Sequence, residues 1–336
     1  MRNLISVIIA LSCSLIGCKS QKAKEVQRTE LGYEVVYDSI FTRMPGTLIK
    51  LNNLAVWQDP FTSGKFLHII NPETKQETIL GNIGPGPKEF TTPIVSRSVD
   101  GNLLICDLNS AKQGVILMNT DSLDLTMKGA SKTESFTDKI MITPEKVVVL
   151  QPNESQPLAI ETDNSVVRFG KQPLSLSTEI TNNYDCFQGA IFFNPQRNLL
   201  VYSTNRFPSF SFYKLSKKGT FELQDEVVPN INYEIVNNEL VFPEDIHGGG
   251  PDITATKDYI IKIERDKKYD KTTAKGRDFT KLPQTLFLYS YEGELQKIVN
   301  MKTPLLRVAG DFSDNMIYAI NADPEFKLIR INLDSL

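Results

Sequence analysis

The chain has 336 residues, of which 37 are Lys or Arg and 40 are Asp or Glu, so its net charge is −3. This balance excludes the strong basic excess expected of a nucleic-acid-binding protein. Two histidines and no Cys/His ligand spacing argue against a zinc site. The length would accommodate two average domains, or one all-β domain, since all-β folds commonly reach this size as a single unit.

The N-terminus has the layout of a secretory signal peptide. Arg2 precedes a mostly apolar run from Leu4 to Ile16, which is typical of such a peptide and too short to span a membrane. The run ends in Leu-Ile-Gly-Cys18, which resembles the lipobox of bacterial lipoproteins, whose cysteine is acylated and becomes the first residue. An ordinary signal peptide with a chance cysteine is the alternative.

The lipobox implies cleavage before Cys18 and a lipid anchor on that cysteine. We therefore expect residues 1–17 to be the signal peptide, 18–30 to be the lipidated cysteine with a polar tether, and 31–336 to be the folded domain. By resemblance to Gram-negative lipoproteins, Lys19 after the cysteine favours the outer membrane. Which side of that membrane the domain faces is open.

Six short apolar runs, each preceded by a polar or turn residue, recur along the chain. Counted from that preceding residue, the runs start at Asn53, Asn102, Lys146, Asn198, Asp258 and Asn315. Such runs, rich in β-branched and aromatic residues, predict strands. A second run begins 12 or 13 residues after the start in five of the six cases, a turn and usually a third run follow it, and a further run precedes each start. This gives four strands in each of six repeats.

Repeats of about 50 residues with four strands each predict an all-β fold, the six-bladed β-propeller with four antiparallel strands per blade. The sixth repeat ends at Leu336 without its outermost strand, and the strand-like run Tyr33–Tyr37 near the N-terminus belongs to no repeat. If that run pairs into the last blade, the ring closes and leaves no open sheet edge. No helix-period segment of useful length is found.

The repeats, the lipobox and the segment Gly81–Phe90 (GNIGPGPKEF) together resemble the TolB-like six-bladed β-propeller lipoproteins, relatives of the NHL-type propellers. The resemblance covers nearly the whole mature chain, although Lys88 stands where that family commonly has glycine. The family mostly lacks assigned activities, so the resemblance implies a fold more than a function. By itself, Gly81–Phe90 could hold an anion on backbone N–H groups, or could be a turn between blades with glycines at positive φ.

Two cysteines besides Cys18 remain in the mature chain, Cys106 and Cys186. An exported pair could form a disulfide. Two separate buried thiols are the alternative, because Cys106 lies in the apolar run that starts at Leu103.

The strand pattern also predicts which face of the propeller carries the long loops. Connections from the second to the third strand of a blade, and from its outermost strand to the next blade, emerge on one face, here called the long-loop face. The long connections 171–188, 229–250 and 264–284 belong to it. Long loops in a compact fold are more often functional or disordered than neutral.

Four charged candidates for a binding site on this face are Asp59, Asp107, Arg206 and Arg265. Each follows an apolar strand run, where strand ends approach the mouth of the central channel. Solvated charge at a strand end is the alternative interpretation.

Two further candidates are His247 and Tyr269. His247 precedes three glycines that resemble the oxyanion strip of some lipases, but no Gly-x-Ser-x-Gly elbow accompanies them. A glycine-rich turn is therefore the better account. Tyr269 lies in the stretch 264–281, whose seven basic and four acidic side chains are typical of a solvated segment.

The leading functional hypothesis is non-enzymatic: a membrane-anchored binding or scaffolding module that recognises an envelope protein, peptide or glycan through the long-loop face. The alternative is a propeller hydrolase or lyase with calcium or another metal in the central channel. Convergent carboxylates in the channel would favour the enzyme, and a mixed-charge or apolar face would favour binding. A purely structural envelope protein would show no preferred pocket. No catalytic residue is predicted.

Overall fold

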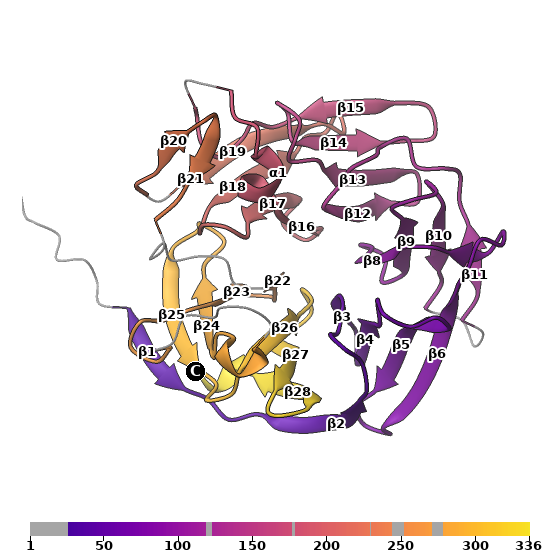
Figure 1. Cartoon of the computed structure of the whole chain (residues 1–336), viewed down its shortest axis with the longest axis vertical. Helices are drawn as coiled ribbons and strands as arrows, with labels where there is room; N and C mark the ends of the chain where they lie inside the picture. The colour runs from indigo at the N-terminus through magenta and orange to yellow at the C-terminus, as the bar shows by residue number, and fades with distance from the viewer. Residues whose placement is uncertain (1–25, 119–122, 177–178, 229, 244–251, 271–277) are drawn as a thin grey trace, which may run out of the picture.

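A computed structural model describes residues 26–118, 123–176, 179–228, 230–243, 252–270 and 278–336, so Cys18 and His247 lie outside the described residues. Six antiparallel sheets surround a central channel as the blades of a propeller (Figure 1). The predicted all-β fold, with six blades of four strands, is confirmed. No helix among the described residues is long and apolar enough to cross a membrane.

The first three blades follow one another along the chain. Blade 1 contains β3 (Leu48–Leu51), β4 (Leu54–Gln58), β5 (Lys65–Asn71) and β6 (Gln76–Ile83), with the short β7 (Glu89–Phe90) parallel to β6. Blade 2 contains β8 (Pro93–Arg97), β9 (Leu103–Asp107), β10 (Gln113–Ile116) and β11 (Leu125–Met127). Blade 3 contains β12 (Asp138–Thr143), β13 (Lys146–Leu150), β14 (Leu158–Glu161) and β15 (Val166–Phe169).

The other three blades complete the ring. Blade 4 contains β16 (Gly189–Asn194), β17 (Leu199–Thr204), β18 (Phe210–Leu215) and β19 (Phe221–Val227). Blade 5 contains β22 (Ile253–Ala255), β23 (Ile260–Glu264), β24 (Thr285–Tyr289) and β25 (Leu295–Asn300). Blade 6 contains β26 (Leu305–Ala309), β27 (Met316–Ala322), β28 (Phe326–Asn332) and the N-terminal β2 (Glu34–Ile40).

The ring closes as the sequence predicted. Strand β2, which covers most of the predicted run, pairs antiparallel with β28 and supplies the missing outermost strand of blade 6. Val36 and Ile40 are buried in the apolar cluster that blades 6 and 1 form together. Arg330 of β28 forms ion pairs with Glu34 of β2 and Glu73 of blade 1. These pairs are exposed and add little to stability, so apolar burial accounts for most of the closure.

The ordered domain begins before the predicted boundary at residue 31. Strand β1 (Gln27–Glu30) lies within the segment predicted as a tether and pairs parallel with β25, as a fifth strand on the outside of blade 5. Its sequence is Gln-Arg-Thr-Glu and its side chains are mostly exposed. A polar strand on an outer edge has no apolar alternation that a sequence pattern could detect.

The core lies between the blades. The second strand of each blade is covered on both faces by its neighbours; in β9, for example, every residue is buried. This burial explains why the repeated runs are continuously apolar rather than alternating. Cys106 and Cys186 are both buried and free, in separate apolar clusters, so they do not form a disulfide.

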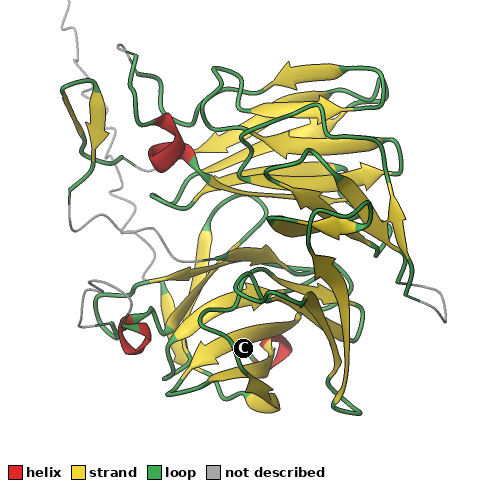
Figure 2. Ribbon diagram, turned by 45° about the vertical axis from the view of Figure 1, so that its right-hand side comes forward, coloured by secondary structure: helices red, strands yellow, loops and turns green. Residues whose placement is uncertain are grey.

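The long loops of blade 4 fold into a small cap on the long-loop face. It consists of helix α1 (Asn183–Phe187) and the hairpin β20 (Glu234–Val236) and β21 (Glu239–Val241), which Figure 2 shows on the same side of the disc. Asn182 joins them, because its amide exchanges two hydrogen bonds with the backbone of Leu240. Buried side chains of both parts form an apolar cluster with Phe207 of blade 4. The cap is therefore packed against the propeller.

The segment Gly81–Phe90 is a turn between blades 1 and 2. Its carbonyl oxygens point inward at Lys112, whose Nζ donates to the carbonyls of Pro85, Gly86 and Glu89 at 2.7–3.1 Å. Gly81 has a φ of +70°, and an added Cβ would lie 2.6 Å from the ring of Phe66. Carbonyls around an ammonium group favour the interpretation as a turn over an anion cradle.

Candidate functional site

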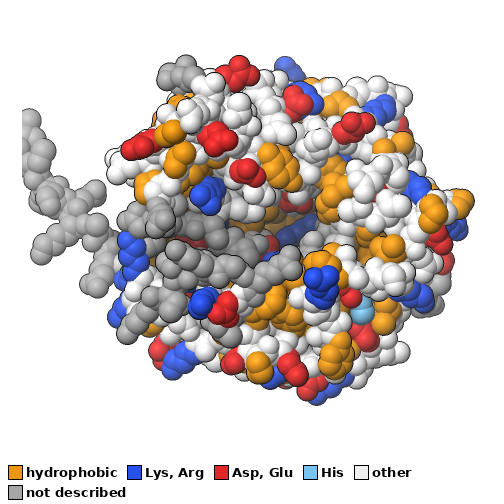
Figure 3. All heavy atoms as spheres, viewed as in Figure 1, with side chains coloured by type: hydrophobic (Ala, Val, Ile, Leu, Met, Phe, Trp, Pro, Cys, Tyr) orange, Lys and Arg blue, Asp and Glu red, His pale blue; other side chains and the backbone are white. Residues whose placement is uncertain are grey.

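The central channel holds two cavities that share the side chain of Arg97. The cavity toward the long-loop face has a volume of about 170 Å³ and includes Asp138, Asn205 and Asp252 in its lining. The cavity toward the opposite face has a volume of about 210 Å³ and includes Lys50 in its lining. Figure 3 shows basic and acidic side chains together inside the central hollow. The channel thus carries charges of both signs, and apolar side chains such as Phe193 and Phe312 also line the second cavity.

Two aspartates fasten the inner strands to one another on the long-loop side. Asp138, at the start of β12, accepts hydrogen bonds from its neighbour Lys139 N–H at 2.8 Å and from Ile191 N–H of blade 4 at 2.9 Å. Asp252, just before β22, accepts hydrogen bonds in the same way from the N–H groups of Ile253 and of Val308 in blade 6, both at 3.0 Å. Innermost strands have one unpaired edge, and buried backbone N–H groups require acceptors. The carboxylates supply them.

Two arginines balance these carboxylates. Arg97 of blade 2 reaches across the channel toward Gly310 O, at 3.4 Å, and Thr254 Oγ1, at 3.5 Å. Arg307 of blade 6 donates through Nε to Gly46 O at 2.6 Å. Burial lowers the pKa of both guanidinium groups, while the charge of Asp252 acts against that effect on each.

Burial shifts both channel carboxyl groups toward the neutral form. It raises the pKa of Asp138 to about 7, against the opposing effects of the Ile191 hydrogen bond and the charge of Arg97. Burial also raises the pKa of Asp252, against the charge of Arg307. Since Asp138 titrates near neutrality, the charge inside the channel depends on pH.

The channel does not assemble a metal-ligand set in the part of the chain that the structure describes. No group of three or more His, Cys, Asp or Glu side chains is placed to hold a metal ion there. Each channel aspartate already accepts two backbone N–H groups. We call the group formed by Asp138, Asp252, Arg97 and Arg307 the channel floor. It carries charges of both signs and is not a site of convergent, unpaired acids.

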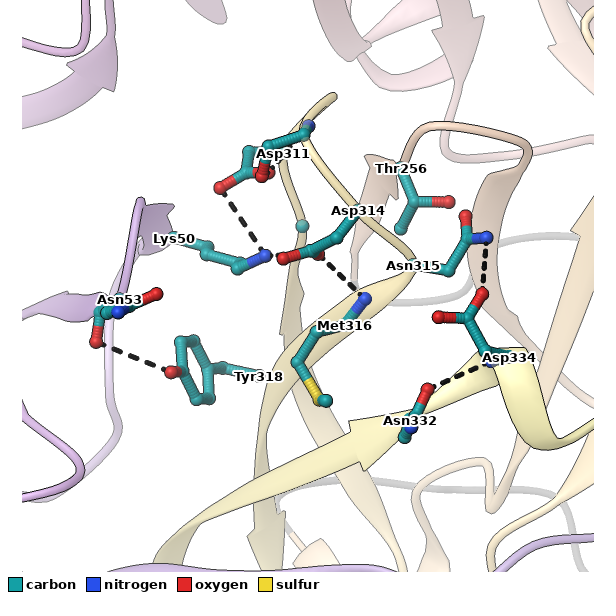
Figure 4. Close-up of polar contacts among 12 residues, drawn as sticks. Lys50, Asn53, Thr256, Asp311, Asp314, Asn315, Met316, Tyr318, Asn332 and Asp334 are labelled. Atoms are coloured by element: carbon teal, nitrogen blue, oxygen red, sulfur yellow. Dashed lines mark hydrogen bonds and ion pairs between the residues drawn. The ribbon is translucent and has the colours of Figure 1, made fainter.

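The polar network on the opposite side of the channel joins blade 1 to blade 6 (Figure 4). Lys50 of β3 is buried, and its Nζ lies 2.5 Å from Asp314 Oδ1 and 3.4 Å from Asp311 Oδ2. Asp314 also accepts a hydrogen bond from Met316 N–H at 2.8 Å. Both acids belong to the turn between β26 and β27, so this network supports closure of the ring.

Asp59 and Asp107 hold the loops that follow their strands. Asp59 Oδ1 accepts hydrogen bonds from Thr42 Oγ1 at 2.7 Å and Phe61 N–H at 3.0 Å. Asp107 is buried and accepts hydrogen bonds from Thr91 and the following residues. Burial raises the pKa of Asp107, but these hydrogen bonds outweigh it and leave the pKa below its ordinary value. Asp107 is therefore ionised, and both carboxylates already accept hydrogen bonds from neighbouring loop residues.

The structure places Arg206, Arg265 and Tyr269 on the long-loop face, apart from the channel floor. Arg206 is exposed next to the cap, and its charge acts on the buried thiol of Cys186. Arg265 is partly buried and donates a hydrogen bond to Lys281 O. The carbonyl of Tyr269 accepts a hydrogen bond from Gln284 Nε2 at 2.9 Å. The third long-loop candidate, His247, is outside the described residues.

A further set of residues on this face was not predicted from the sequence. These are large apolar side chains with exposed fractions between 39% and 81%: Phe41, Phe61, Leu108, Tyr184, Tyr233, Val236 and Val241. They belong to the connections at blades 1 and 2 and to the cap over blade 4. Single apolar residues in loops carry no sequence signal of their own, because burial depends on the tertiary structure.

Comparison with known proteins supports the fold. The chain matches no family model and no curated protein. It is similar to the calcium-binding protein regucalcin from Agrobacterium tumefaciens, with 10% identity over 91% of this chain and 95% of that one, at a TM-score of 0.54. It is also similar to a protein from Bacteroides fragilis that is described as exported, with 10% identity over 91% and 98% of the two chains, at a TM-score of 0.58. At this identity, the likeness shows the propeller fold alone.

Proposed function

We propose that this protein is a lipid-anchored binding module of the bacterial cell envelope that recognises a protein or peptide through its long-loop face. The exposed apolar side chains on that face carry the proposal. Of the thirteen described large apolar side chains that are exposed, seven lie there, including Phe41 at 81% and Phe61 at 49%. Contiguous exposed apolar patches rimmed by polar residues mark interaction sites, and aromatic side chains are enriched in protein interfaces.

The cap gives this face a stable shape. Its apolar cluster and the two hydrogen bonds between Asn182 and Leu240 fix α1 against the hairpin. Tyr184 lies on α1 and Val236 on β20, and both are exposed, as is Tyr233 directly before β20. Ordering in advance of binding reduces the entropy lost when a partner is bound.

The N-terminal sequence supports the proposed location. The signal-peptide layout and the lipobox ending in Cys18 support export and acylation, and Lys19 supports the outer membrane. Kinship with the TolB-like and NHL-like propeller lipoproteins rests on the same lipobox, the repeats and Gly81–Phe90. The fold shared with an exported Bacteroides protein is compatible with this assignment.

A hydrolase or lyase with a channel metal is the second candidate. The charge of Asp252 acts on the pKa of Asp138, so the two carboxyl groups lie near each other, and the similar regucalcin is a calcium-binding protein. Against it, Arg97 and Arg307 balance both carboxylates, which also accept backbone N–H groups. Metal analysis and thermal denaturation with calcium or a chelator test this candidate. Bound metal, with a rise of several degrees in melting temperature, would favour it over the binding module.

The binding proposal is tested with the chain from residue 19 onward, which contains every described strand. The immobilised protein is exposed to envelope proteins and peptides, and the affinity of the retained partner is then measured for Phe41→Ser, Phe61→Ser and Arg206→Ala. Matched controls are Val167→Ser and Leu223→Ser, exposed apolar positions on outer strands. Loss of at least about tenfold in affinity for the long-loop variants alone supports the proposal. Equal affinities across both sets would refute it.

A further inference from the structure

A larger cavity of about 620 Å³ lies between blades 4 and 5, away from the channel. Its volume is in the range of small-molecule pockets, roughly 300–1,000 Å³. The apolar lining consists of Phe287 and Tyr289 from β24, Leu295 and Ile298 from β25, and Val26 beside β1. These side chains belong to the interface cluster of blades 4 and 5, which here remains open on one side. We refer to this cavity as the blade 4–5 cleft.

Basic side chains predominate around the blade 4–5 cleft. Arg28, Arg265, Lys267 and Lys268 line it, against the acids Glu264 and Asp266. Asp266 is paired with Arg28, whose Nε lies 3.0 Å from its Oδ2.

The second acid is also balanced from within the blade. Glu264 is buried, its Oε1 lies 3.4 Å from Lys262 Nζ, and its Oε2 accepts a hydrogen bond from Tyr289 at 3.1 Å. Among the charged side chains that line the blade 4–5 cleft, the four basic ones thus outnumber the two acidic ones.

We propose that the blade 4–5 cleft binds a single long-chain fatty acid, with its hydrocarbon chain on Phe287, Tyr289 and Ile298 and its carboxylate toward Lys267 and Lys268. The apolar floor and the cationic rim match the two ends of such a molecule. A neutral or cationic head group would forgo the attraction at the rim, and a short chain would leave apolar surface in contact with water.

The cleft also lies close to the start of the described chain. Val26 is eight residues after Cys18, and eight extended residues reach at most about 28 Å. If Cys18 is anchored as proposed above, the cleft stays within that distance of the bilayer, where acyl chains are abundant. The supply of ligand from the bilayer rests on the proposed lipid anchor, whereas binding in the cleft does not. Either proposal can therefore be refuted without the other.

Fluorescence titration tests the proposal, with 11-(dansylamino)undecanoic acid as the probe and unlipidated protein from residue 19 onward. Dodecanoate below its micellar concentration should displace the probe, whereas dodecyltrimethylammonium, with the same chain and the opposite charge, should not. Affinity should rise up to about fourfold for each methylene added between octanoate and dodecanoate. No displacement by dodecanoate, or equal displacement by both head groups, would overturn the proposal.

Two matched pairs of variants locate the site. The double variant Lys267→Glu/Lys268→Glu should weaken dodecanoate binding by about tenfold, while Lys217→Glu/Lys218→Glu, an exposed pair on the turn between β18 and β19, should not. Leu295→Asp should abolish binding, while Leu125→Asp, at the equivalent first position of the fourth strand of blade 2, should not.

Circular dichroism confirms that each variant is folded. Unchanged binding in the two cleft variants would refute the assignment. Vesicles of phosphatidylglycerol provide the last comparison: sedimentation with vesicles, without binding of monomeric dodecanoate, would show a membrane-surface site and refute a fatty-acid pocket.

Discussion

Replacing Asp138 with asparagine should remove a pH dependence of stability that the channel imposes. Burial raises the pKa of Asp138 to about 7, whereas an unfolded aspartate has a pKa of about 3.9. The folded state therefore binds the proton more tightly than the unfolded state. A group of this kind stabilises the protein most at low pH, and its contribution falls as pH rises through the folded pKa.

The size of the effect follows from the two pKa values. Between pH 5 and pH 7 the unfolded aspartate is ionised throughout, while the folded one is mostly protonated until pH 7. This difference lowers the free energy of unfolding by about 2 kcal/mol over that interval. The hydrogen bond from Ile191 and the charge of Arg97 are present in both forms of the group, and their effects on the folded pKa are already included.

Urea denaturation of wild type and Asp138→Asn at pH 5, 6, 7 and 8 measures this contribution. The variant can differ in absolute stability, because its amide replaces a carboxylate that accepts two N–H groups. A constant offset does not affect the comparison of slopes. The wild type should lose about 2 kcal/mol relative to the variant from pH 5 to pH 7. Parallel curves for the two proteins would refute the assignment of a raised pKa to this group.

Three further predictions concern glycine conformation, ring closure and thiol reactivity. Gly81→Ala and Gly101→Ala both place alanine at positive φ, but only at Gly81 would the new Cβ meet a ring, at 2.6 Å. In urea denaturation, Gly101→Ala should lower the free energy of unfolding by about 1–2 kcal/mol. Gly81→Ala should lower it by about 1–3 kcal/mol more. Equal losses for the two variants would contradict the steric argument. Lys50→Met should lower the free energy of unfolding by about 1–3 kcal/mol. This is less than the loss for a fully buried ion pair, because the two acidic partners of Lys50 are 21% and 47% exposed. A loss below about 0.5 kcal/mol, which is typical of an exposed ion pair, would contradict a role in ring closure. Burial raises the pKa of Cys106 to about 12 and of Cys186 to about 11, so neither thiol should react with a disulfide reagent at pH 8 until the protein is unfolded.

The sequence was sufficient to predict the blades because their strands carry a local signal. Second strands such as β9 are apolar throughout, since neighbouring blades cover both faces, and turn residues separate the runs. The closing strand β2 was also predicted from a local signal, the strand-like run Tyr33–Tyr37. Strand β1 was missed because its residues are polar and pair in parallel at an outer edge.

The hairpin of the cap has a detectable signal in the sequence. The hairpin β20–β21 turns at Asn237 and Asn238, both at positive φ, between apolar residues on either side. Consecutive residues of this type favour the type I′ turn of a two-residue hairpin.

Arg97 and Asp252 stand at the ends of predicted innermost strands. Whether their side chains point into the channel depends on the twist of the blade, and the alternation of residues along a strand does not give that twist.

The channel and the long-loop face serve different purposes in this interpretation. Asp138 and Asp252 supply acceptors to the unpaired N–H groups of neighbouring innermost strands and so connect blade 3 to blade 4 and blade 5 to blade 6. A carboxylate committed to the backbone is poorly suited to exchange protons with a substrate, whereas the exposed Phe41 is available for contact without disturbing the ring. Asp138→Asn should therefore alter the pH dependence of stability and leave binding of the proposed partner unchanged, and Phe41→Ser should do the reverse. If Asp138→Asn also abolished binding in a folded protein, the ligand would have to reach the channel floor, and the division between a structural channel and a recognising face would be wrong.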